Sequence, residues 1–339
     1  MHHQILSQLD NLLNTKENNR RLIILIEKLF VSFRNISDAL RNNECSCTTI
    51  GTHNSFGESQ LDIDIRTDEM IFNALKESNV VHIGSSEESP TEIDCLEVNK
   101  WNLKEDEGFS MGFDPLDGSS IVGCNFAIGT ICGIWSGKGL IGQKCKDLVC
   151  SIMVIYGPKT IIVLSFNDTI TRDKQKKCIE ITMSENGWYM TNPSFLIDKK
   201  EKYYSPGNLA ATVENTDYKR VHDFWLDNKY KLRYSGGLVP DVYHILIKKT
   251  GVFTNFSSDK HKAKLRLIYE ILPIGLIIES AGGKSFICNE NELHDEISSD
   301  KVIDNLEERV NVCYGSIDEV KKFINIYYNK ENVTNLNYP

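Results

Sequence analysis

Apolar side chains recur at three- and four-residue intervals along residues 20–41, which is the spacing that predicts an amphipathic helix. The stretch 64–76 has the same periodicity and predicts a second helix. Shorter apolar runs bounded by turn residues predict strands. These runs cover 80–83, 126–135 and 160–166. The apolar run at 146–156 is predicted to be a helix.

Residues 167–200 are polar and lack a clear period, and regular patterns resume after them. The second half is predicted to contain helices over 212–229, 239–249 and 271–280, with strands over 231–234 and 251–254. This alternation of helices and strands indicates an α/β protein. The break suggests two units, 1–195 and 196–339.

Composition restricts the class of protein. The chain has 339 residues, a net charge of −9 and 41% apolar residues, which is ordinary for a globular protein. The acidic balance argues against a nucleic-acid partner. No apolar run reaches the length of a membrane span, so no membrane partner is expected, and the N-terminus lacks the pattern of a signal peptide. The expected location is cytoplasmic, where the ten cysteines would be reduced.

The most informative motif is Asp114-Pro115-Leu116-Asp117-Gly118-Ser119-Ser120. Two carboxylates three residues apart are suited to divalent cations, and the N–H groups after Gly118 could receive a phosphate. Gly118 also permits a positive φ. Asp, Pro and Gly are ordinary turn residues as well, so a surface turn is the alternative interpretation. The strand predicted directly after the motif favours a phosphate and metal site.

Further acids occur where such a site would need them. Glu87 and Glu88 follow a predicted strand, Glu58 and Asp64 precede a predicted helix, and Glu279 ends an apolar run. Taken singly, each could be a solvated or capping acid, because acids are mostly exposed.

Together, these segments resemble the fructose-1,6-bisphosphatase superfamily, most closely its sedoheptulose-bisphosphatase branch. The resemblance extends from about Asn54 to Gly315. It rests on NSFGESQL, SSEESP, GFDPLDGSSIV, GTICGIW, YGPKT, SPGNL, LRYSGGLVPDV, GVFTN, KAKLRLIYE and ESAGG. It implies an α/β chain with the layered αβαβα sugar-phosphatase fold and an active site between the two halves.

The resemblance also implies a ligand set for Mg²⁺, with Mn²⁺ as an alternative. The implied cation ligands are Glu87, Asp114, the Leu116 carbonyl, Asp117 and Glu279. Glu58, Asp64 and Glu88 are implied to hold a further cation and activate water, and Glu87 is counted with the catalytic group. The family more often has Asp at position 58, and the longer Glu alters the reach of this ligand.

The implied substrate contacts come from both halves. Asp117, Gly118, Ser119 and Ser120 would face the phosphate that is cleaved. Arg233 and Tyr234 resemble the pair that grips the distal phosphate, with the arginine contributed by the neighbouring subunit of a homodimer. Lys264 and Arg266 resemble the cations that bind the sugar phosphate. Asn208 in SPGNL and Asn255 in GVFTN follow the sedoheptulose type, and fructose-bisphosphatases carry a tyrosine at the position of Asn255. Ala210 departs from the sedoheptulose type, which usually has an arginine after SPGNL.

The resemblance predicts hydrolysis of the 1-phosphate of sedoheptulose 1,7-bisphosphate, a reaction of carbohydrate metabolism. A fructose-1,6-bisphosphatase without AMP control, or an enzyme of dual specificity, is the alternative within enzymes. A non-catalytic sugar-phosphate sensor is the alternative from another class. Plastid relatives carry a regulatory pair of cysteines just before the NSFG segment. Only Cys47 falls at a matching position here and Thr52 replaces the other cysteine, so a redox switch of that type is not expected.

Overall fold

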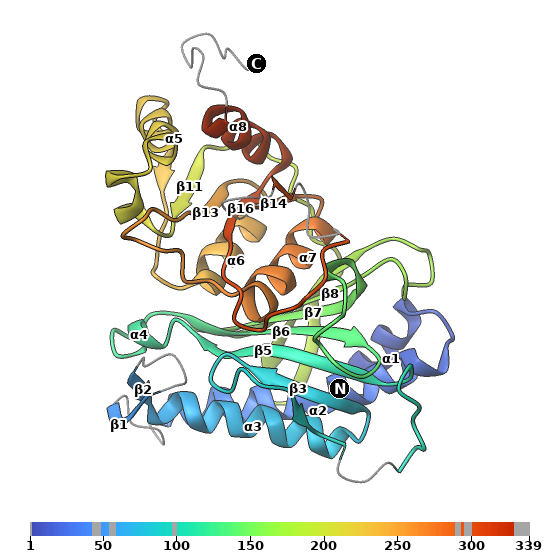
Figure 1. Cartoon of the computed structure of the whole chain (residues 1–339). Helices are drawn as coiled ribbons and strands as arrows, with labels where there is room; N and C mark the ends of the chain where they lie inside the picture. The colour runs from blue at the N-terminus through green and yellow to red at the C-terminus, as the bar shows by residue number, and fades with distance from the viewer. Residues whose placement is uncertain are drawn as a thin grey trace.

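The computed structural model describes residues 2–42, 49–53, 59–96, 100–288, 293–294 and 300–328. Helices and sheets alternate in five layers (Figure 1). This arrangement confirms the predicted layered α/β fold. The division of the chain near residue 195 stays a prediction.

The first layer is helical and packs on one face of the first sheet. Its long helices bury the apolar stripe that the sequence predicted, including Ile26, Phe30 and Phe33. Because buried apolar surface stabilises a fold by about 25 cal/mol per Å², this stripe fixes the helices on the sheet. The helices are α1 (His2–Leu12), α2 (Glu17–Arg41) and α3 (Asp62–Ser78).

Among the described residues the first sheet has eight strands, in the order β10-β9-β8-β7-β6-β5-β3-β4. The β3–β5 pair is parallel and the other pairs are antiparallel. The strands are β3 (Val81–Ser86), β4 (Ile93–Asp94), β5 (Phe109–Asp117), β6 (Ile128–Ser136), β7 (Leu148–Tyr156), β8 (Thr160–Phe166), β9 (Lys177–Ser184) and β10 (Gly187–Asn192). A small separate pair lies before α3, β1 (Thr49–His53) with β2 (Ser59–Leu61).

The predicted helix over 146–156 is wrong, because this segment is the central strand β7, preceded by the short turn η1 (Cys145–Asp147). All nine residues of β7 are buried, so its two faces show no alternation of apolar and polar side chains. Periodicity alone cannot separate such a strand from a buried helix. The polar segment 167–200 likewise contains an unpredicted hairpin, β9–β10.

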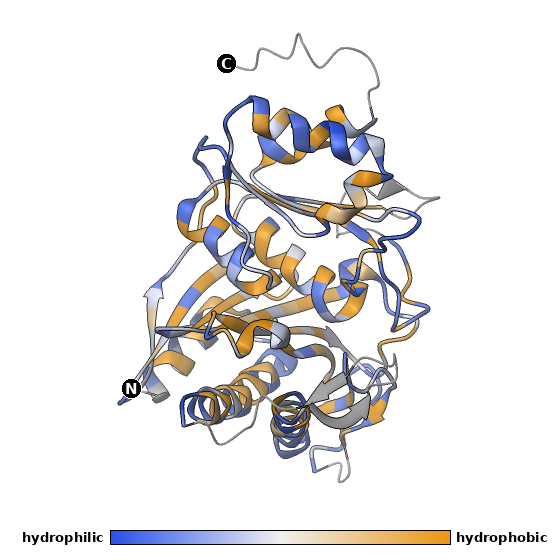
Figure 2. Ribbon diagram, turned by 90° about the vertical axis from the view of Figure 1, so that its left-hand side faces the viewer, coloured by the Kyte–Doolittle hydropathy of each residue, from blue (hydrophilic) through white to orange (hydrophobic). Residues whose placement is uncertain are grey.

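The middle layer consists of two helices between the sheets, α6 (Leu238–Lys248) and α7 (Leu272–Ser280). Figure 2 shows that these helices are largely apolar, as expected for elements covered on both sides. The π-helical turn η3 (Leu267–Ile271) leads directly into α7. This layer lies in one apolar cluster that includes Trp135, Val242 and Ile277.

The second sheet has the order β12-β11-β13-β16-β14-β15 among the described residues. Its outer face is covered by helices that bury Trp225 and Phe323. The strands are β11 (Tyr203–Pro206), β12 (Lys231–Leu232), β13 (Val252–Asn255), β14 (Lys284–Cys288), β15 (Leu293–His294) and β16 (Asn311–Gly315). The covering elements are η2 (Leu209–Val213), α5 (Thr216–Asp227) and α8 (Ile317–Tyr328).

Candidate metal centre and phosphate turn

Three carboxylates lie together at one end of the first sheet. One oxygen from each of Glu87, Asp114 and Glu270 lies within 4.8 Å of the others. Glu87 follows β3, and its N–H donates to the Phe113 carbonyl on β5 at 3.0 Å. Because β3 and β5 are parallel neighbours, their carboxyl ends meet at the same sheet edge, where open α/β sheets bind ligands.

Glu270 reaches this edge from the second half of the chain, on the η3 turn. It is buried, and its Oε2 accepts a hydrogen bond from the Arg266 N–H at 2.6 Å. The turn packs directly on β5 because residue 112 is glycine. A Cβ at Gly112 would lie 3.1 Å from Ile268 Cγ1, which is tighter than ordinary contact. The close packing therefore positions the carboxylate of Glu270 beside Asp114.

The structure does not bring the predicted ligand Glu279 into this cluster. Glu279 lies near the end of α7, where its Oε2 accepts from Lys176 Nζ at 2.9 Å and its Oε1 accepts from Ser285 Oγ. We therefore replace Glu279 by Glu270 in the candidate ligand set. Sequence reasoning missed Glu270 although a signal existed. An acid inside the otherwise apolar run LIYEI cannot face solvent without breaking the run, so it needs a buried partner.

Burial and like charge set the electrostatics of the cluster. Burial raises the pKa of Asp114 well above its usual range, and the charges of Glu87, Glu270 and Asp117 raise it further. The pKa of Glu270 is raised by burial and by Glu87, while the charge of Arg266 opposes the shift. Arg266 is buried and forms an ion pair with Glu87. Three hard oxygen donors with excess negative charge fit a divalent cation.

Asp117 has a different environment from the three clustered carboxylates. Its Oδ1 accepts from the Leu238 N–H at 3.1 Å and its Oδ2 from the Val239 N–H at 2.7 Å. Both donors belong to the first turn of α6, whose N–H groups have no partner within the helix. Burial raises the pKa of Asp117 to about 6 although these two hydrogen bonds lower it. Asp117 thus joins the end of β5 to the start of α6.

The turn that the sequence predicts to receive a phosphate, Gly118-Ser119-Ser120, directly follows Asp117. Gly118 has φ +84°, which confirms the expectation that this glycine permits a positive φ. It precedes the short helix α4 (Ser119–Val122), on which Ser119 is half-buried and Ser120 is exposed. Leu116 is buried, and its N–H donates to Asp114 Oδ1 at 2.9 Å. This hydrogen bond ties the backbone of the turn to the Asp114 carboxylate.

The acids predicted to activate water lie near the start of α3 and after β3. Asp64 is buried in the first turn of α3, and Glu88 is half-buried next to Glu87. Glu58 lies outside the described residues. The sequence reasoning did not identify Asp68, which lies one helical turn after Asp64 and hydrogen-bonds Ser86. Burial raises the pKa of Asp68 to about 7, and the charge of Glu88 contributes.

The predicted sugar-phosphate contacts occupy the second half. Lys264 is exposed, four residues before buried Ile268 on η3. Asn208 Nδ2 donates to the carbonyls of Phe256 and His261, both at 2.9 Å, and so braces the loop that leads to Lys264. Asn255 is buried at the end of β13, and its Oδ1 has no hydrogen-bond partner among the described residues.

Arg233 and Tyr234 are exposed beside the edge strand β12. The Arg233 guanidinium lies 5.6 Å from the centre of the Tyr203 ring, a cation–π distance. The Tyr234 hydroxyl donates to the Gly207 carbonyl at 3.0 Å. The structure therefore places this pair on the surface next to the SPGNL loop, with the guanidinium accessible to another molecule.

Five alternating layers, with clustered carboxylates beside a Gly-Ser turn, define the layered sugar-phosphatase class. The family model described as "Fructose-1-6-bisphosphatase, N-terminal domain" matches residues 4–174, and the corresponding C-terminal domain model matches residues 197–328. The chain belongs to the fructose-1,6-bisphosphatase family and is a phosphoric monoester hydrolase. The resemblance inferred from the sequence is thereby confirmed.

Individual relatives agree with this assignment. The chain is 38% identical over 320 residues to "Sedoheptulose-1,7-bisphosphatase, chloroplastic" of Triticum aestivum, covering 94% of this chain and 76% of that protein. It is 36% identical over 265 residues to "Fructose-1,6-bisphosphatase class 1" of Trichlorobacter lovleyi, covering 77% and 78%. A crystal structure of a putative sedoheptulose-1,7 bisphosphatase from Toxoplasma gondii matches with a TM-score of 0.80 and 31% identity, over 96% and 97% of the two chains.

In the part of the chain that the structure describes, no helix is both long and apolar enough to cross a membrane. Cys45 and Cys47 lie outside the described residues. Eight cysteines lie among the described residues, and seven of these are buried.

Proposed function

We propose that this chain hydrolyses the 1-phosphate of sedoheptulose 1,7-bisphosphate, releasing sedoheptulose 7-phosphate and phosphate, with Mg²⁺ or Mn²⁺ as cofactor. The observation that carries the proposal is the cluster of Glu87, Asp114 and Glu270 beside the Gly118 turn. A carboxylate cluster would repel a sugar bisphosphate unless cations neutralised it. An anionic substrate at this site therefore requires cations bound to the carboxylates. The names of the similar proteins support the seven-carbon substrate.

The chain's own groups have separate roles in this mechanism. Glu87, Asp114 and Glu270, with the Leu116 carbonyl and Asp117, would hold the cations. A divalent cation held there would polarise the phosphate ester and make water more acidic. The N–H groups and hydroxyls of Ser119 and Ser120 would orient the phosphate.

Glu88 and Asp64 are the proposed acceptors of the proton from the attacking water. Asp68 would position the segment that carries Glu88, because it hydrogen-bonds Ser86, two residues before Glu88. We assign Asp68 as a positioning residue and not as a proton acceptor.

The second phosphate requires cations outside the cluster. Lys264 is exposed and Arg266 is buried against Glu87, so Lys264 is the better placed of the two to meet a phosphate that enters from solvent. Arg266 then compensates the charge of the acidic cluster. Arg233 and Tyr234 would grip the distal phosphate in the site of a neighbouring subunit. The homodimer that this requires can be tested by sedimentation, and a monomer at assay concentration would contradict it.

The alternative substrate is fructose 1,6-bisphosphate, because other relatives are named fructose-1,6-bisphosphatase. Ala210 favours this alternative, because it lacks a cation usual in the sedoheptulose type. The deciding experiment measures phosphate release and compares kcat/KM for the two bisphosphates with Mg²⁺. A preference for the seven-carbon sugar is expected, and EDTA should abolish release. Equal or reversed preference would favour the alternative, and release insensitive to EDTA would overturn the metal mechanism.

Asn255→Tyr is expected to shift substrate preference toward the six-carbon sugar. Asn255 is buried with an unpartnered Oδ1, so a substrate hydroxyl that bonds this atom would lose its partner. A site built to hydrogen-bond a substrate rejects analogues that lack the group, and the loss of one such bond costs about 1–3 kcal/mol. The measurement is the ratio of kcat/KM values for the two bisphosphates. Asn255→Ala is the second test variant, because it removes the amide oxygen without adding a ring. An unchanged ratio in both variants would exclude Asn255 from specificity.

Mg²⁺ is expected to raise the melting temperature more at alkaline than at acidic pH. Asp117 has a pKa of about 6 in the fold, and those of Asp114 and Glu270 are also raised, so the native state binds more protons than the unfolded chain above about pH 4. Without metal, the free energy of unfolding therefore falls as the pH rises from about 4 through the raised pKa of Asp117, about 6. A bound cation favours the ionised carboxylates and removes the loss. Thermal melts with Mg²⁺ and with EDTA at about pH 5 and pH 8 test this. An equal Mg²⁺ effect at both values would contradict the proposed ligands.

We keep the cytosol as the proposed compartment. The names of the sedoheptulose relatives from plants and algae include the word chloroplastic, so the compartment requires its own test. Fractionation of cells that express the full chain would supply it, and recovery with an organelle would contradict the proposal.

A further inference from the structure

A cavity of about 610 Å³ lies directly behind the catalytic turn, on the side of the sheet that α2 and α3 cover. This volume is within the range of small-molecule sites, about 300–1,000 Å³. The cavity wall includes Ile63, next to Asp64, and Val122 and Gly123, which follow Ser119 and Ser120. Among the described residues, none of the proposed ligands or substrate contacts lines it, so we treat it as a site beside the candidate active site.

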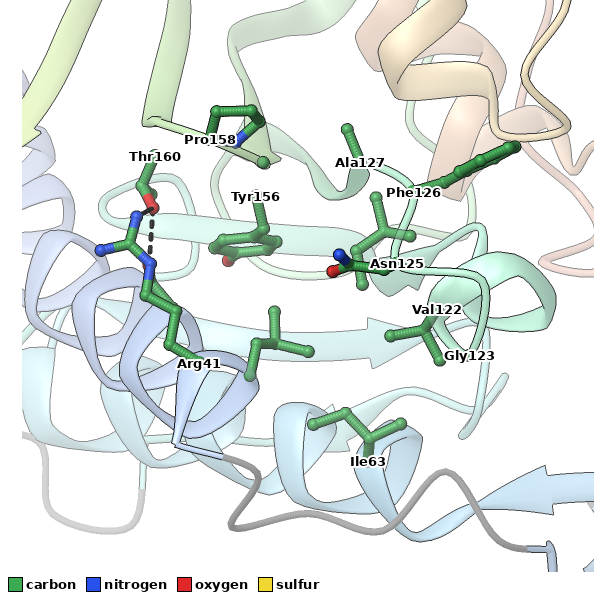
Figure 3. Close-up of a pocket in the computed structure, with 14 residues that line it drawn as sticks. Arg41, Ile63, Val122, Gly123, Asn125, Phe126, Ala127, Tyr156, Pro158 and Thr160 are labelled. Carbon is green, nitrogen blue, oxygen red and sulfur yellow. Dashed lines mark hydrogen bonds between the residues drawn. The ribbon is translucent and has the colours of Figure 1, made fainter.

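The lining combines one cation with apolar and hydroxyl groups. Arg41, at the end of α2, carries the only formal charge among the described residues that line the cavity. Its Nη2 donates to Thr160 Oγ1 at 3.2 Å, and no carboxylate of the described residues pairs with it. In Figure 3, Arg41 and Thr160 lie on one side of the Tyr156 ring, and Val122 and Asn125 lie on the other.

A ligand for this cavity must satisfy both parts of the lining. The planar guanidinium of Arg41 is suited to a carboxylate, sulfonate or phosphate, which it can bind through two parallel hydrogen bonds. The Tyr156 ring with Val122, Ile63 and half-exposed Phe126 offers apolar contact to the rest of the molecule. The lining therefore favours a small organic anion with a flat apolar body.

A hydrogen-bonded chain joins the cavity to the catalytic turn. Thr130 Oγ1 donates to the Pro115 carbonyl at 2.8 Å, and Thr130 Oγ1 and the Tyr156 hydroxyl lie 3.0 Å apart. A hydroxyl has one proton, so the bond to Pro115 uses that of Thr130, and Tyr156 must be the donor to Thr130. Pro115 lies between Asp114 and Asp117. A ligand that moves Tyr156 would therefore change the support of both aspartates.

We propose that this cavity is an effector site for a small aromatic organic anion, bound by Arg41 and coupled to the metal turn through Tyr156, Thr130 and Pro115. The proposal that the cavity binds a ligand rests only on the residues that line it. The coupling rests on the proposed function, because it assigns the turn at 114–117 to metal and phosphate. By linkage, ligands at the turn and in the cavity must change each other's affinity by the same factor.

The first experiment measures binding of anilinonaphthalene sulfonate, a fluorescent aromatic anion, to the full chain. Saturable binding at one site is expected, and Arg41→Gln should weaken it by about tenfold, the loss of one charged hydrogen-bond partner. Arg20→Gln is the matched control, because Arg20 lies on the same helix, is exposed and does not line the cavity. Gly123→Trp should also block binding, since a Cβ at Gly123 has open space around it and its φ of −63° accepts any side chain. Equal binding by wild type, Arg41→Gln and Gly123→Trp would overturn the site.

The second experiment measures the same probe affinity with and without Mg²⁺ and inorganic phosphate. A shift of about fivefold or more is expected in the wild type, the lower end of usual allosteric coupling. Tyr156→Phe removes the bond to Thr130, so it should still bind the probe but show no shift. Probe binding that Mg²⁺ and phosphate leave unchanged in the wild type would overturn the coupling. Because probe binding needs no turnover, failure of this inference is distinguishable from failure of the proposed phosphatase reaction.

Discussion

Glu270→Gln is expected to lower kcat on a sugar bisphosphate by on the order of 10³-fold, a loss typical of removing one electrostatic group from an active site. Glu270 supplies one of the three clustered carboxylates, and glutamine keeps its shape but not its charge. The metal-free variant should be at least as stable as the wild type, because burial and Glu87 raise the pKa of Glu270 and so penalise its charged form. Steady-state kinetics and thermal melts in EDTA test the two parts.

Glu279→Gln is the matched control for Glu270→Gln. It makes the same chemical change nine residues later, on α7, where the carboxylate pairs with Lys176. We expect kcat within a few-fold of the wild type and a loss of stability of about 1–3 kcal/mol from the weakened charged hydrogen bonds. If Glu279→Gln lost activity and Glu270→Gln kept it, the cation ligand would be Glu279, as the sequence predicted, and not Glu270.

Asp117→Ala is expected to cost on the order of 10³-fold in turnover and also to destabilise the fold. Asp117 is a proposed cation ligand, and it accepts hydrogen bonds from Leu238 and Val239 at the start of α6. Loss of a capping side chain costs about 1 kcal/mol. Turnover with saturating Mg²⁺ and the free energy of unfolding in urea measure these two effects.

Asp117→Asn separates the two roles of Asp117. Asparagine keeps one oxygen acceptor for the helix but loses the negative charge, so stability should be partly retained while turnover remains low. Near-wild-type turnover of Asp117→Asn with saturating Mg²⁺ would show that Asp117 only supports α6. The ligand set would then consist of the three clustered carboxylates and the Leu116 carbonyl.

The sequence by itself determined the α/β class of fold and singled out the turn at 114–120. Local spacing contributes to both, because a 3.6-residue period marks α2 and α3, and a glycine at position 118 permits the positive φ that the turn adopts. Local spacing failed at β7, whose nine buried residues carry no period. A segment covered on both faces presents the same apolar pattern as a helix or as a strand, so its sheet neighbours decide between the two.

Only the tertiary structure decided which distant acid joins the turn. Glu270 and Glu279 follow similar apolar runs, and sequence spacing from Asp114 favours neither. The choice depends on Gly112, which lets the π turn η3 pack on β5, and on Lys176, directly before β9, which pairs with Glu279. The cavity behind the turn is likewise built from α2, α3, β7 and β8 together. Contacts between segments far apart in the chain leave no local pattern, because a side chain's partners are set by packing and not by its sequence neighbours.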